Sequence, residues 1–335
     1  MRKSVIHSVT TMTPLRVSLV GGGTDFPGFY NLQNGLVVSM TIQKFIYVTV
    51  KRHSPLFGEK YRISYSDTEH VNSLDEIRND IARECIRLVG IDEPLFISTA
   101  SDLPAGSGLG SSSSFAVGLL LALHEFTGDH VSVGQLAEEA CMVEINILNR
   151  PIGKQDQYAA AFGGLNSFKF YGTNRVSIDS ITLESEGYKI LNDLVLVWTG
   201  MSRKAEDILH EQNNNITNNL NFLQELYLEA ENLKNILIEG KFNSLVLSKV
   251  LNNNWDLKKR FAPGITNETI NSLYDECFAA GATGGKLLGA GGGGFIVVNV
   301  PTEKRTEFLK KIKGHPSIFV SIEHRGTRIL SRVDL

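Results

Sequence analysis

The sequence predicts an α+β fold. Segments rich in β-branched and aromatic residues come first, at residues 15–20, 37–42, 45–50 and 61–66, and turn residues separate them, as expected for short strands. Helical patterns and further strands follow, but strand and helix do not alternate strictly, which favours an α+β fold over a parallel α/β sheet. A length of 335 residues indicates two domains or one large domain.

Periodicity predicts the remaining elements of the first half. Apolar residues at helical spacing predict helices over residues 77–88 and 114–126, and Gly128 ends the second of them. Residues 95–100 predict a strand between these helices.

The second half of the chain begins near residue 194. An apolar segment at 194–198 predicts a strand, and a long amphipathic pattern at 203–239 predicts helix. A glycine-rich segment at 281–294 leads into a strand over 295–300. Such a density of glycine is expected where backbone or ligand packs closely, and the alternative is a mobile loop.

Composition excludes several classes of function. A net charge of -3 gives no global attraction to nucleic acid, and no uninterrupted apolar run reaches the roughly 18 residues of a membrane span. The cysteines, Cys85, Cys141 and Cys277, are far apart and show no CxxC spacing, so neither a disulfide framework nor a zinc site is expected. We therefore expect a cytoplasmic protein, monomeric or homodimeric, that acts on small molecules rather than on nucleic acid or membranes.

A glycine- and serine-rich segment, residues 102–114 with the sequence DLPAGSGLGSSSS, precedes an apolar helix. Gly106, Gly108 and Gly110 let the backbone approach a ligand closely, and the free N–H groups at the start of a helix favour an anion. In the motif GxxxxGK[ST] a lysine follows the last glycine, but none follows Gly110 here. Serines also stand where the motif GxGxxG has its third glycine, so the segment matches neither motif. The segment predicts a phosphate-binding loop; the alternative is a flexible linker, which the flanking apolar residues disfavour.

Two further segments place charged residues beside glycines. Arg16 lies on a predicted strand that leads into the glycine turn at 21–23 and then to Asp25. Glu144 lies on a predicted helix, and Asp156 follows it in a loop. Each of these residues also has a purely structural interpretation. Arg16 could be a surface charge, and Asp25 could cap the N-terminus of a helix. Glu144 and Asp156 could be exposed carboxylates.

Together these segments resemble the GHMP kinase family, named for galactokinase, homoserine kinase, mevalonate kinase and phosphomevalonate kinase. Residues 104–112 resemble its PxxxGLGSS phosphate loop, and residues 281–294 resemble its C-terminal glycine motif. The resemblance implies a ribosomal-protein-S5-like N-terminal half, the ATP-binding domain over residues 1–190, and a ferredoxin-like α/β C-terminal half over residues 191–335. It also implies ATP and Mg²⁺ as cofactors.

The resemblance assigns roles to individual residues. Asp156 matches the aspartate of the Pro-x-Gly-x-x-Asp-Gln pattern in galactokinase-like members, and Arg16 matches the arginine of their first motif, so both are expected to be catalytic. Ser112 and Glu144 are expected to bind Mg²⁺. The residues expected to bind ATP are Pro104, Gly106, Ser107, Gly108, Leu109, Gly110, Ser111, Ser112 and Ser113. The residues expected to bind the sugar are Gly22, Gly23, Thr24, Asp25, Gly164, Arg203, Lys286 and Gly291.

The first motif departs from that of galactokinase, where a glutamate and a histidine stand in place of Gly22 and Gly23. The strings LRVSLVGGGTDFPGFY and GKQDQYAAAFGG most resemble the heptose 7-phosphate kinases of the family. This implies phosphorylation of the anomeric C1 hydroxyl of D-glycero-D-manno-heptose 7-phosphate, toward nucleotide-activated heptose. We hypothesise that the two glycines make room for the arm that carries the 7-phosphate. The candidate cations for that phosphate are Lys44, Arg83, Arg87, Arg203 and Lys286.

Three alternatives stay open. The first is a GHMP-type kinase that acts at C1 of an unphosphorylated sugar such as fucose, galactose or glucuronate. The second is a non-catalytic relative that acts as a sensor, which the presence of Arg16, Glu144 and Asp156 disfavours. The third is a dinucleotide oxidoreductase, which the sequence Met40-Thr-Ile-Gln-Lys44 disfavours because it lacks the acidic residue expected about 20 positions after a glycine turn.

Overall fold

The computed structural model describes residues 6–202 and 205–334. The strands are β1 (Ile6–Val20), β2 (Gly35–Arg52), β3 (Tyr61–Ser64), β4 (Thr68–Val71), β5 (Leu95–Ser101), β6 (Leu165–Phe170), β7 (Val176–Ser180), β8 (Leu194–Trp198), β9 (Gly284–Leu287), β10 (Phe295–Asn299), β11 (Ser317–Phe319) and β12 (Arg328–Asp334). The α-helices are α1 (Pro27–Tyr30), α2 (Asp80–Val89), α3 (Ser111–Thr127), α4 (Val133–Cys141), α5 (Gln155–Phe162), α6 (Ser185–Leu191), α7 (Ala205–Asn214), α8 (Leu220–Ile238), α9 (Ser244–Lys258), α10 (Glu268–Ala280) and α11 (Arg305–Lys311). Short 3₁₀ segments lie at Leu74–Glu76, Thr217–Asn219 and Thr302–Lys304, and a π-helical segment spans Met142–Ile147.

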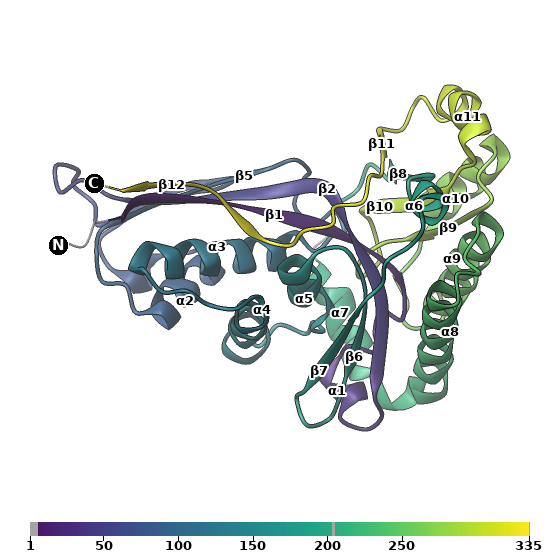
Figure 1. The fold of residues 1–335 in the computed structure, drawn as a ribbon, viewed down its shortest axis with the longest axis horizontal. Helices are drawn as coiled ribbons and strands as arrows, with labels where there is room; N and C mark the ends of the chain where they lie inside the picture. The colour runs from purple at the N-terminus through teal and green to yellow at the C-terminus, as the bar shows by residue number, and fades with distance from the viewer. Residues whose placement is uncertain (1–5, 203–204, 335) are drawn as a thin grey trace.

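Two separate sheets form the framework of the fold (Figure 1). The larger sheet has eight strands, with the order β12-β1-β2-β5-β3-β4, and β6 and β7 continue from β2 as a branch. Its neighbouring strands run antiparallel except for β3 and β5, which are parallel. The smaller sheet has four antiparallel strands in the order β11-β8-β10-β9. This mixture of sheets and helices confirms the predicted α+β class.

Strand β2 connects the two branches of the larger sheet. Residues 35–40 pair with β6, and residues 46–52 pair with β5. Strand is therefore confirmed at residues 37–42 and 45–50, but their prediction as two separate strands is wrong, because β2 is one strand of 18 residues. The register of its pairing with β1 shifts around Gln43, so a β-bulge lies where a turn between two strands was predicted.

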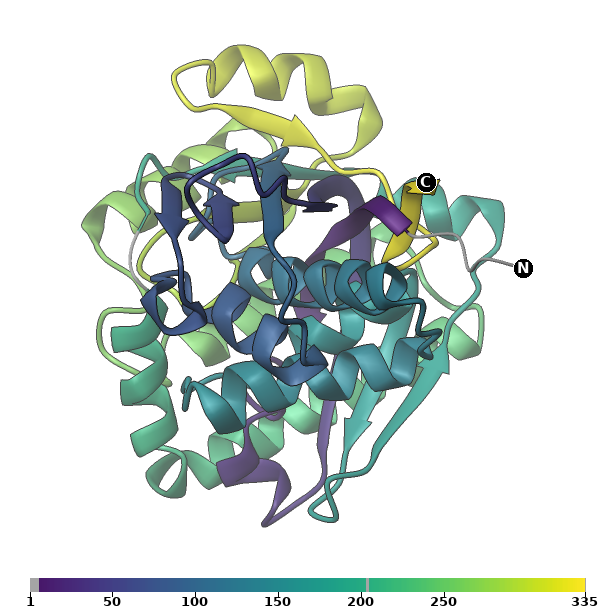
Figure 2. The same cartoon turned by 90° about the vertical axis from the view of Figure 1, so that its left-hand side faces the viewer.

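Helices α2, α3, α4 and α5 cover one face of the larger sheet (Figure 1, Figure 2). Helix α3 contacts β1 and β2 directly, and α2 and α4 pack against α3. A glycine permits the close approach of α3 to β1: a Cβ on Gly118 would lie 2.5 Å from Thr13 Oγ1, and Thr11 Oγ1 donates to the Gly118 carbonyl at 2.8 Å. The nearly uniform burial of α3 explains its apolar sequence and fixes the position of its N-terminus.

In the second half, α9 and α10 pack against the smaller sheet and α11 packs against α10, whereas α8 packs against α9 and against β1 and β2 of the larger sheet (Figure 1). The amphipathic pattern predicted over 203–239 forms two helices, α7 and α8, with a 3₁₀ turn between them. The glycine-rich segment contains a strand that the sequence did not indicate, because β9 (284–287) is fully buried between α9 and β10. Among the described residues, no helix has the length and apolar character needed to cross a membrane.

The last strand, β12, returns to the larger sheet and pairs with β1 at its edge. The start of β1 and the end of β12 consequently lie at the same end of the molecule, where Ile6 pairs with Asp334 (Figure 1). The division into domains at residue 190 stays a prediction, and the C-terminal seven-residue strand contributes to the sheet of the first half.

Candidate active site

A cleft of about 610 Å³ lies between the two halves of the molecule. From the first half it is lined by β1, the turn after β1, residues 104–113, which we call the serine loop, and the start of α5. From the second half it is lined by α7, the end of α9 and residues 281–294, which we call the glycine segment. A cavity of this size accommodates small-molecule ligands.

The serine loop leads directly into α3. Gly110 precedes the helix with a φ of 77°, and no side chain caps the first turn, which starts at Ser111. The N–H groups of this turn are therefore available to an anion. A Cβ on Gly110 would lie 3.2 Å from Asp156 Oδ2 and 3.3 Å from Arg16 Cγ. Glycine at this position thus permits the left-handed backbone and brings the head of α3 against these two residues.

Glu144 is fully buried on the π-helical segment Met142–Ile147. Its Oε1 accepts from Ser112 Oγ at 2.6 Å, and its Oε2 accepts from Ser113 Oγ and Gln157 Nε2, both at 2.7 Å. Burial raises the pKa of Glu144, and the hydrogen bonds from the two serines oppose this shift. The π-helical turn, a feature common at functional sites, directs this carboxylate toward the serine loop.

The residues expected to bind Mg²⁺ are in contact with each other. A site for Mg²⁺ in kinases often has one or two protein carboxylates, with phosphate oxygens and water completing it. Ser112 and Glu144 supply a hydroxyl and a carboxylate beside the head of α3, so the donors fit this ion when a polyphosphate is bound. Arg150 also reaches Ser112 Oγ, at 2.8 Å, and is held by Asp80 at 2.9 Å. Among the described residues, no group of three or more His, Cys, Asp or Glu side chains is arranged to hold a metal ion by itself.

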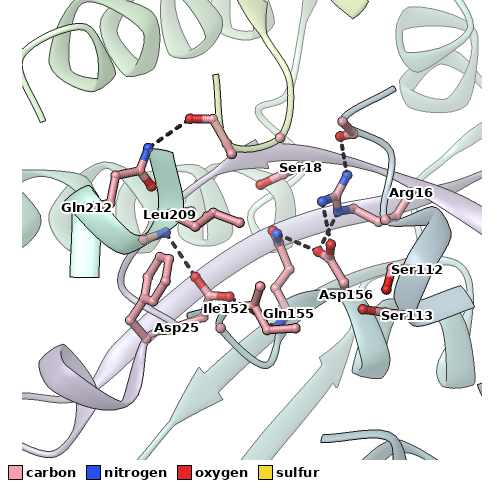
Figure 3. A pocket seen from close by; sticks show the side chains of 18 of the residues that line it. Arg16, Ser18, Asp25, Ser112, Ser113, Ile152, Gln155, Asp156, Leu209 and Gln212 are labelled. Atoms are coloured by element: carbon pink, nitrogen blue, oxygen red, sulfur yellow. Dashed lines mark hydrogen bonds and ion pairs between the residues drawn. The ribbon is translucent and has the colours of Figure 1, made fainter. Parts of the chain in front are cut away.

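Arg16 and Asp156, which are far apart in sequence, form a two-point ion pair (Figure 3). Arg16 Nε donates to Asp156 Oδ1 and Arg16 Nη2 donates to Asp156 Oδ2, both at 2.7 Å. The third contact of the guanidinium, from Nη1 to the carbonyl of Gly108, is 2.6 Å long. The pair therefore links β1, the start of α5 and the serine loop at one point of the cleft.

Asp25 lies further along the cleft and is buried (Figure 3). Its Oδ1 accepts from the N–H of Gly23 at 2.9 Å, and its Oδ2 accepts from the N–H of Gln155 at 3.1 Å. Burial is the main cause of its raised pKa, and the nearby charge of Asp156 adds to the shift. Gly153 has room only for hydrogen beside this carboxylate, since a Cβ there would lie 2.0 Å from Asp25 Oδ2. Asp25 thus fixes the turn before α5 and lines the cleft.

The two glycines that replace the galactokinase side chains differ in their surroundings. A Cβ on Gly22 would meet only Ser18 Oγ, at 3.5 Å, and the φ of Gly22 is not in the left-handed region. Gly23 has a φ of +103°, and a Cβ there would lie 3.3 Å from both Leu223 and Phe261. The expectation that both glycines open space is therefore wrong for Gly23, because side chains from the second half pack against it.

Most of the predicted site residues meet in the cleft. Those that line it are Arg16, Gly22, Gly23, Asp25, Gly106, Gly108, Gly110, Ser111, Ser112, Ser113, Glu144, Asp156 and Lys286. Those that lie outside its lining are Pro104, Ser107, Leu109, Thr24, Gly164 and Gly291. Arg203 lies outside the described residues.

The predicted residues outside the lining have backbone or packing contacts instead. The Thr24 hydroxyl donates to a carbonyl of its own turn at 2.7 Å. Leu109 is fully buried, and its carbonyl accepts from the N–H of Arg16 at 3.0 Å. Gly164 donates its N–H to the carbonyl of Glu323 at 3.0 Å, on the side toward the C-terminal segment. Thr24 and Leu109 thereby stabilise the backbone beside the cleft.

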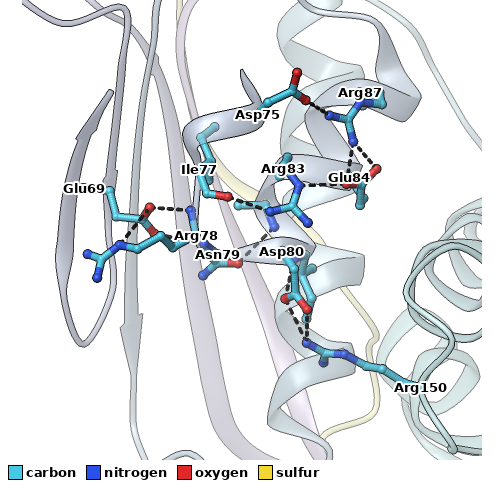
Figure 4. A network of polar contacts seen from close by, with 12 residues as sticks. Glu69, Asp75, Ile77, Arg78, Asn79, Asp80, Arg83, Glu84, Arg87 and Arg150 are labelled. Carbon is cyan, nitrogen blue, oxygen red and sulfur yellow. Dashed lines mark hydrogen bonds and ion pairs between the residues drawn. The ribbon is translucent and has the colours of Figure 1, made fainter. Parts of the chain in front are cut away.

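Of the described candidate cations for a distal phosphate, Lys286 lines the cleft. Arg83 and Arg87 both pair with Glu84 in a surface network on α2 (Figure 4). Lys44 is absent from the cleft lining. The arginines of α2 therefore do not line this cleft.

Sequence reasoning missed several residues that line the cleft. Ser18 follows Arg16 by two positions on β1, so strand alternation would have placed both on one face. Ser18 Oγ and Gln155 Oε1 are buried and have no hydrogen-bond partner among the described residues, which marks them as ligand-facing groups. Lys258, at the end of α9, also lines the cleft, and no local pattern distinguished it from a surface lysine.

Comparisons with known proteins agree with this geometry. The family models described as the N-terminal domain and the C-terminal domain of GHMP kinases match residues 76–164 and 244–314. A D-glycero-alpha-D-manno-heptose 7-phosphate kinase from Campylobacter jejuni is 30% identical over 92% of this chain and 94% of its own length. A galactokinase from Pyrococcus furiosus is 26% identical over 94% of this chain and 97% of its own length. The crystal structure of a D-glycero-D-manno-heptose 1-phosphate kinase from Bacteroides thetaiotaomicron shares the fold, with a TM-score of 0.78 and 24% identity over 96% of this chain and 99% of that chain.

Proposed function

Because this chain belongs to the GHMP kinase family, we propose that it transfers the terminal phosphoryl group of ATP to the anomeric C1 hydroxyl of D-glycero-D-manno-heptose 7-phosphate. The product would be the 1,7-bisphosphate. Three features that meet in one cleft support the proposal: the uncapped head of α3, the Ser112–Glu144 pair and the Arg16–Asp156 pair. The family and its α+β fold, both expected from the motifs, are confirmed.

The serine loop binds the phosphates of ATP in this proposal. The N–H groups of the first turn of α3 and the hydroxyls of Ser111 and Ser113 contact the phosphate oxygens. Ser112 and Glu144 would hold Mg²⁺, which when bound neutralises negative charge on those oxygens. Arg16 lies where the serine loop meets Asp156, so its guanidinium balances the charge of the phosphoryl group in transfer.

Asp156 orients the acceptor in this proposal. Its carboxylate accepts the proton of the C1 hydroxyl while the hydroxyl oxygen bonds to the terminal phosphorus and the bond from that phosphorus to ADP breaks. Asp25, Ser18 and Gln155 lie beside Asp156 in the cleft and bind hydroxyls of the sugar (Figure 3). The alignment of the two reactants supplies most of the rate enhancement expected for phosphoryl transfer.

The choice of heptose 7-phosphate rests on two observations. The Campylobacter jejuni relative, at 30% identity, is named for that substrate. In addition, Gly22 leaves open space in the cleft where galactokinases carry a glutamate. The Bacteroides thetaiotaomicron structure is named for a heptose 1-phosphate, so the position of the phosphate on the acceptor is part of the proposal.

A panel of acceptors tests this substrate. ADP release would be measured with heptose 7-phosphate and with unphosphorylated heptose, fucose, galactose and glucuronate, and phosphorus NMR would locate the new phosphate. We expect the highest kcat/KM with heptose 7-phosphate and a product phosphorylated at C1. A higher kcat/KM with an unphosphorylated sugar would overturn the substrate but keep the kinase activity. Binding of ATP without turnover of any acceptor would instead indicate a sensor.

A further inference from the structure

Two lysines also line the cleft, next to the point where the glycine segment packs against the serine loop: a Cβ on Gly289 would lie 2.5 Å from Gly108 Cα. They are Lys286 on β9 and Lys258 at the end of α9. The Lys286 ammonium is buried and donates to the carbonyl of Leu19 at 3.2 Å. The Lys258 ammonium donates to the carbonyl of Gly289. Within the described chain neither ammonium forms an ion pair with a carboxylate, so backbone carbonyls are their hydrogen-bond partners.

The charged groups that face these lysines are mostly cations. Burial lowers the pKa of Lys258 to about 7, the positive charge of Arg16 on β1 lowers it further, and Asp156 on α5 partly opposes both effects. Burial also lowers the pKa of Lys286 well below its usual range, and the charges of Lys258 and Arg16 add to that shift. When both lysines are protonated, three positive charges face the single carboxylate of Asp156, and an anion bound among them reduces their mutual repulsion.

A hydroxyl without a partner completes this group. Ser18 is 7% exposed, its Oγ has no hydrogen-bond partner among the described residues, and it faces the cleft (Figure 3). It stands on β1 next to Leu19, whose carbonyl accepts from Lys286. Its Oγ also lies 3.5 Å from the position of a Cβ on Gly22, so it borders the open space at that glycine. An unpaired buried hydroxyl that lines the same cleft as two lysines without carboxylate partners is suited to an oxyanion.

We propose that Ser18, Lys258 and Lys286 form a second phosphate-binding site beside the serine loop. The phosphate can come from two sources, the acceptor sugar or the terminal phosphoryl group of ATP. The open space at Gly22 favours the acceptor, and this choice rests on the proposed function. Lys258 and Lys286 come from the second half of the molecule, so a phosphate bound here would also hold the two halves together across the cleft.

Calorimetric titration of inorganic phosphate into the full-length protein, with and without saturating ADP, tests the site without assuming a sugar. We expect phosphate to bind when ADP occupies the serine loop, and Lys258→Met and Lys286→Met each to weaken this binding at least tenfold. Lys259→Met is the matched control, because Lys259 is the next residue, is exposed and pairs with Asp256 at 2.8 Å. Its phosphate affinity should equal that of the wild type. Urea unfolding of each variant verifies that it is folded.

The pH dependence of sulfate binding gives a second readout, since sulfate stays doubly charged from pH 6 to 9. Binding of an anion favours the protonated lysine, so the affinity is highest below the pKa of free Lys258, about 7, and falls as the pH rises through it. One linked proton gives a slope of up to about tenfold per pH unit. Lys258→Arg, which keeps its charge, should retain affinity at pH 8.5 and show a shallower slope.

Steady-state kinetics then identify the source of the phosphate. If the acceptor supplies it, Lys258→Met raises KM for the phosphorylated sugar at least tenfold more than it raises KM for the unphosphorylated analogue. If ATP supplies it, kcat falls with every acceptor. Either result supports a phosphate site. The proposal is overturned if phosphate and sulfate bind Lys258→Met and Lys286→Met as tightly as the wild type. An error in the proposed sugar would leave the calorimetric results unaffected.

Discussion

The open space at Gly22 gives the sharpest prediction about substrate choice. Gly22→Ala introduces a Cβ whose nearest neighbour is Ser18 Oγ at 3.5 Å, an ordinary contact, and the backbone there suits an L-residue. We therefore expect Gly22→Ala to retain stability and activity. Gly22→Glu restores the side chain of galactokinase, and Gly22→Gln adds the same length without charge. Gly23 is left unchanged, because any side chain there would be strained at its φ of +103°.

The expected size of the effect follows from charge and space. Two like unit charges about 4 Å apart at an effective dielectric constant of about 20 repel by about 4 kcal/mol, which is roughly a thousandfold in affinity. A flexible glutamate can turn away from a bound phosphate, so we expect a loss of at least about 100-fold in kcat/KM for heptose 7-phosphate. Gly22→Gln only fills space and should lose about tenfold, a cost comparable to overpacking of one side chain.

The assay is ADP release at varied heptose 7-phosphate and saturating ATP, with urea unfolding as a control for stability. The kcat/KM of Gly22→Ala should match that of the wild type within about threefold, as expected for a position with room for a methyl group. KM for ATP should be unchanged in all three variants, since Gly22 is not part of the serine loop. Retention of full kcat/KM by Gly22→Glu would refute the idea that this glycine opens the site for a phosphorylated arm.

Two further predictions concern the phosphate side of the cleft. Because burial raises the pKa of Glu144, protonation at low pH should increase the Mg²⁺ concentration needed for half-maximal activity as the pH falls through that raised value. Glu144→Gln should need more Mg²⁺ at every pH and lose this pH dependence, and a wild-type Mg²⁺ requirement that does not change between pH 5 and 8 would contradict the assignment. Gly110→Ala should cost about 1–2 kcal/mol of stability from its left-handed φ of 77° and also lower kcat, because its Cβ would press on Asp156. Gly128→Ala, at the other end of α3 with a φ of 85° and no neighbour within 4 Å, should show the same loss of stability with unchanged kcat, and equal kcat in both variants would argue against the role of Gly110.

Local sequence carried enough information to predict the serine loop and the helix that follows it. The serine loop combines glycines, hydroxyls and a helix start within a few residues, so its chemistry could be inferred without the fold. Glu144 and Asp156 were found through the motif that contains them. What the sequence did not provide was the geometry of the Arg16–Asp156 ion pair, because its partners are on different elements and meet only after β1 and α5 pack together.

The second half of the molecule was harder to predict. Lys258 ends an amphipathic helix, where a lysine is usually a surface charge, and it faces the cleft only because α9 packs against β9. The crowding of Gly23 likewise depends on Leu223 and Phe261, which come from the other half of the chain. Strand β9 was not predicted because glycine is unfavourable in strands, and it forms here because α9 and β10 cover it closely.

The central claim is that the head of α3 holds the phosphates of ATP while Asp156 directs the acceptor oxygen to the terminal phosphorus. Asp156→Asn tests it most directly, with ATP affinity and kcat measured on the same preparation. We predict an ATP Kd within about threefold of the wild type and a kcat at least about 100-fold lower, as expected for removal of a group that accepts a proton in the transition state. A variant that turns over at the wild-type rate, or one that no longer binds ATP, would contradict this separation of roles.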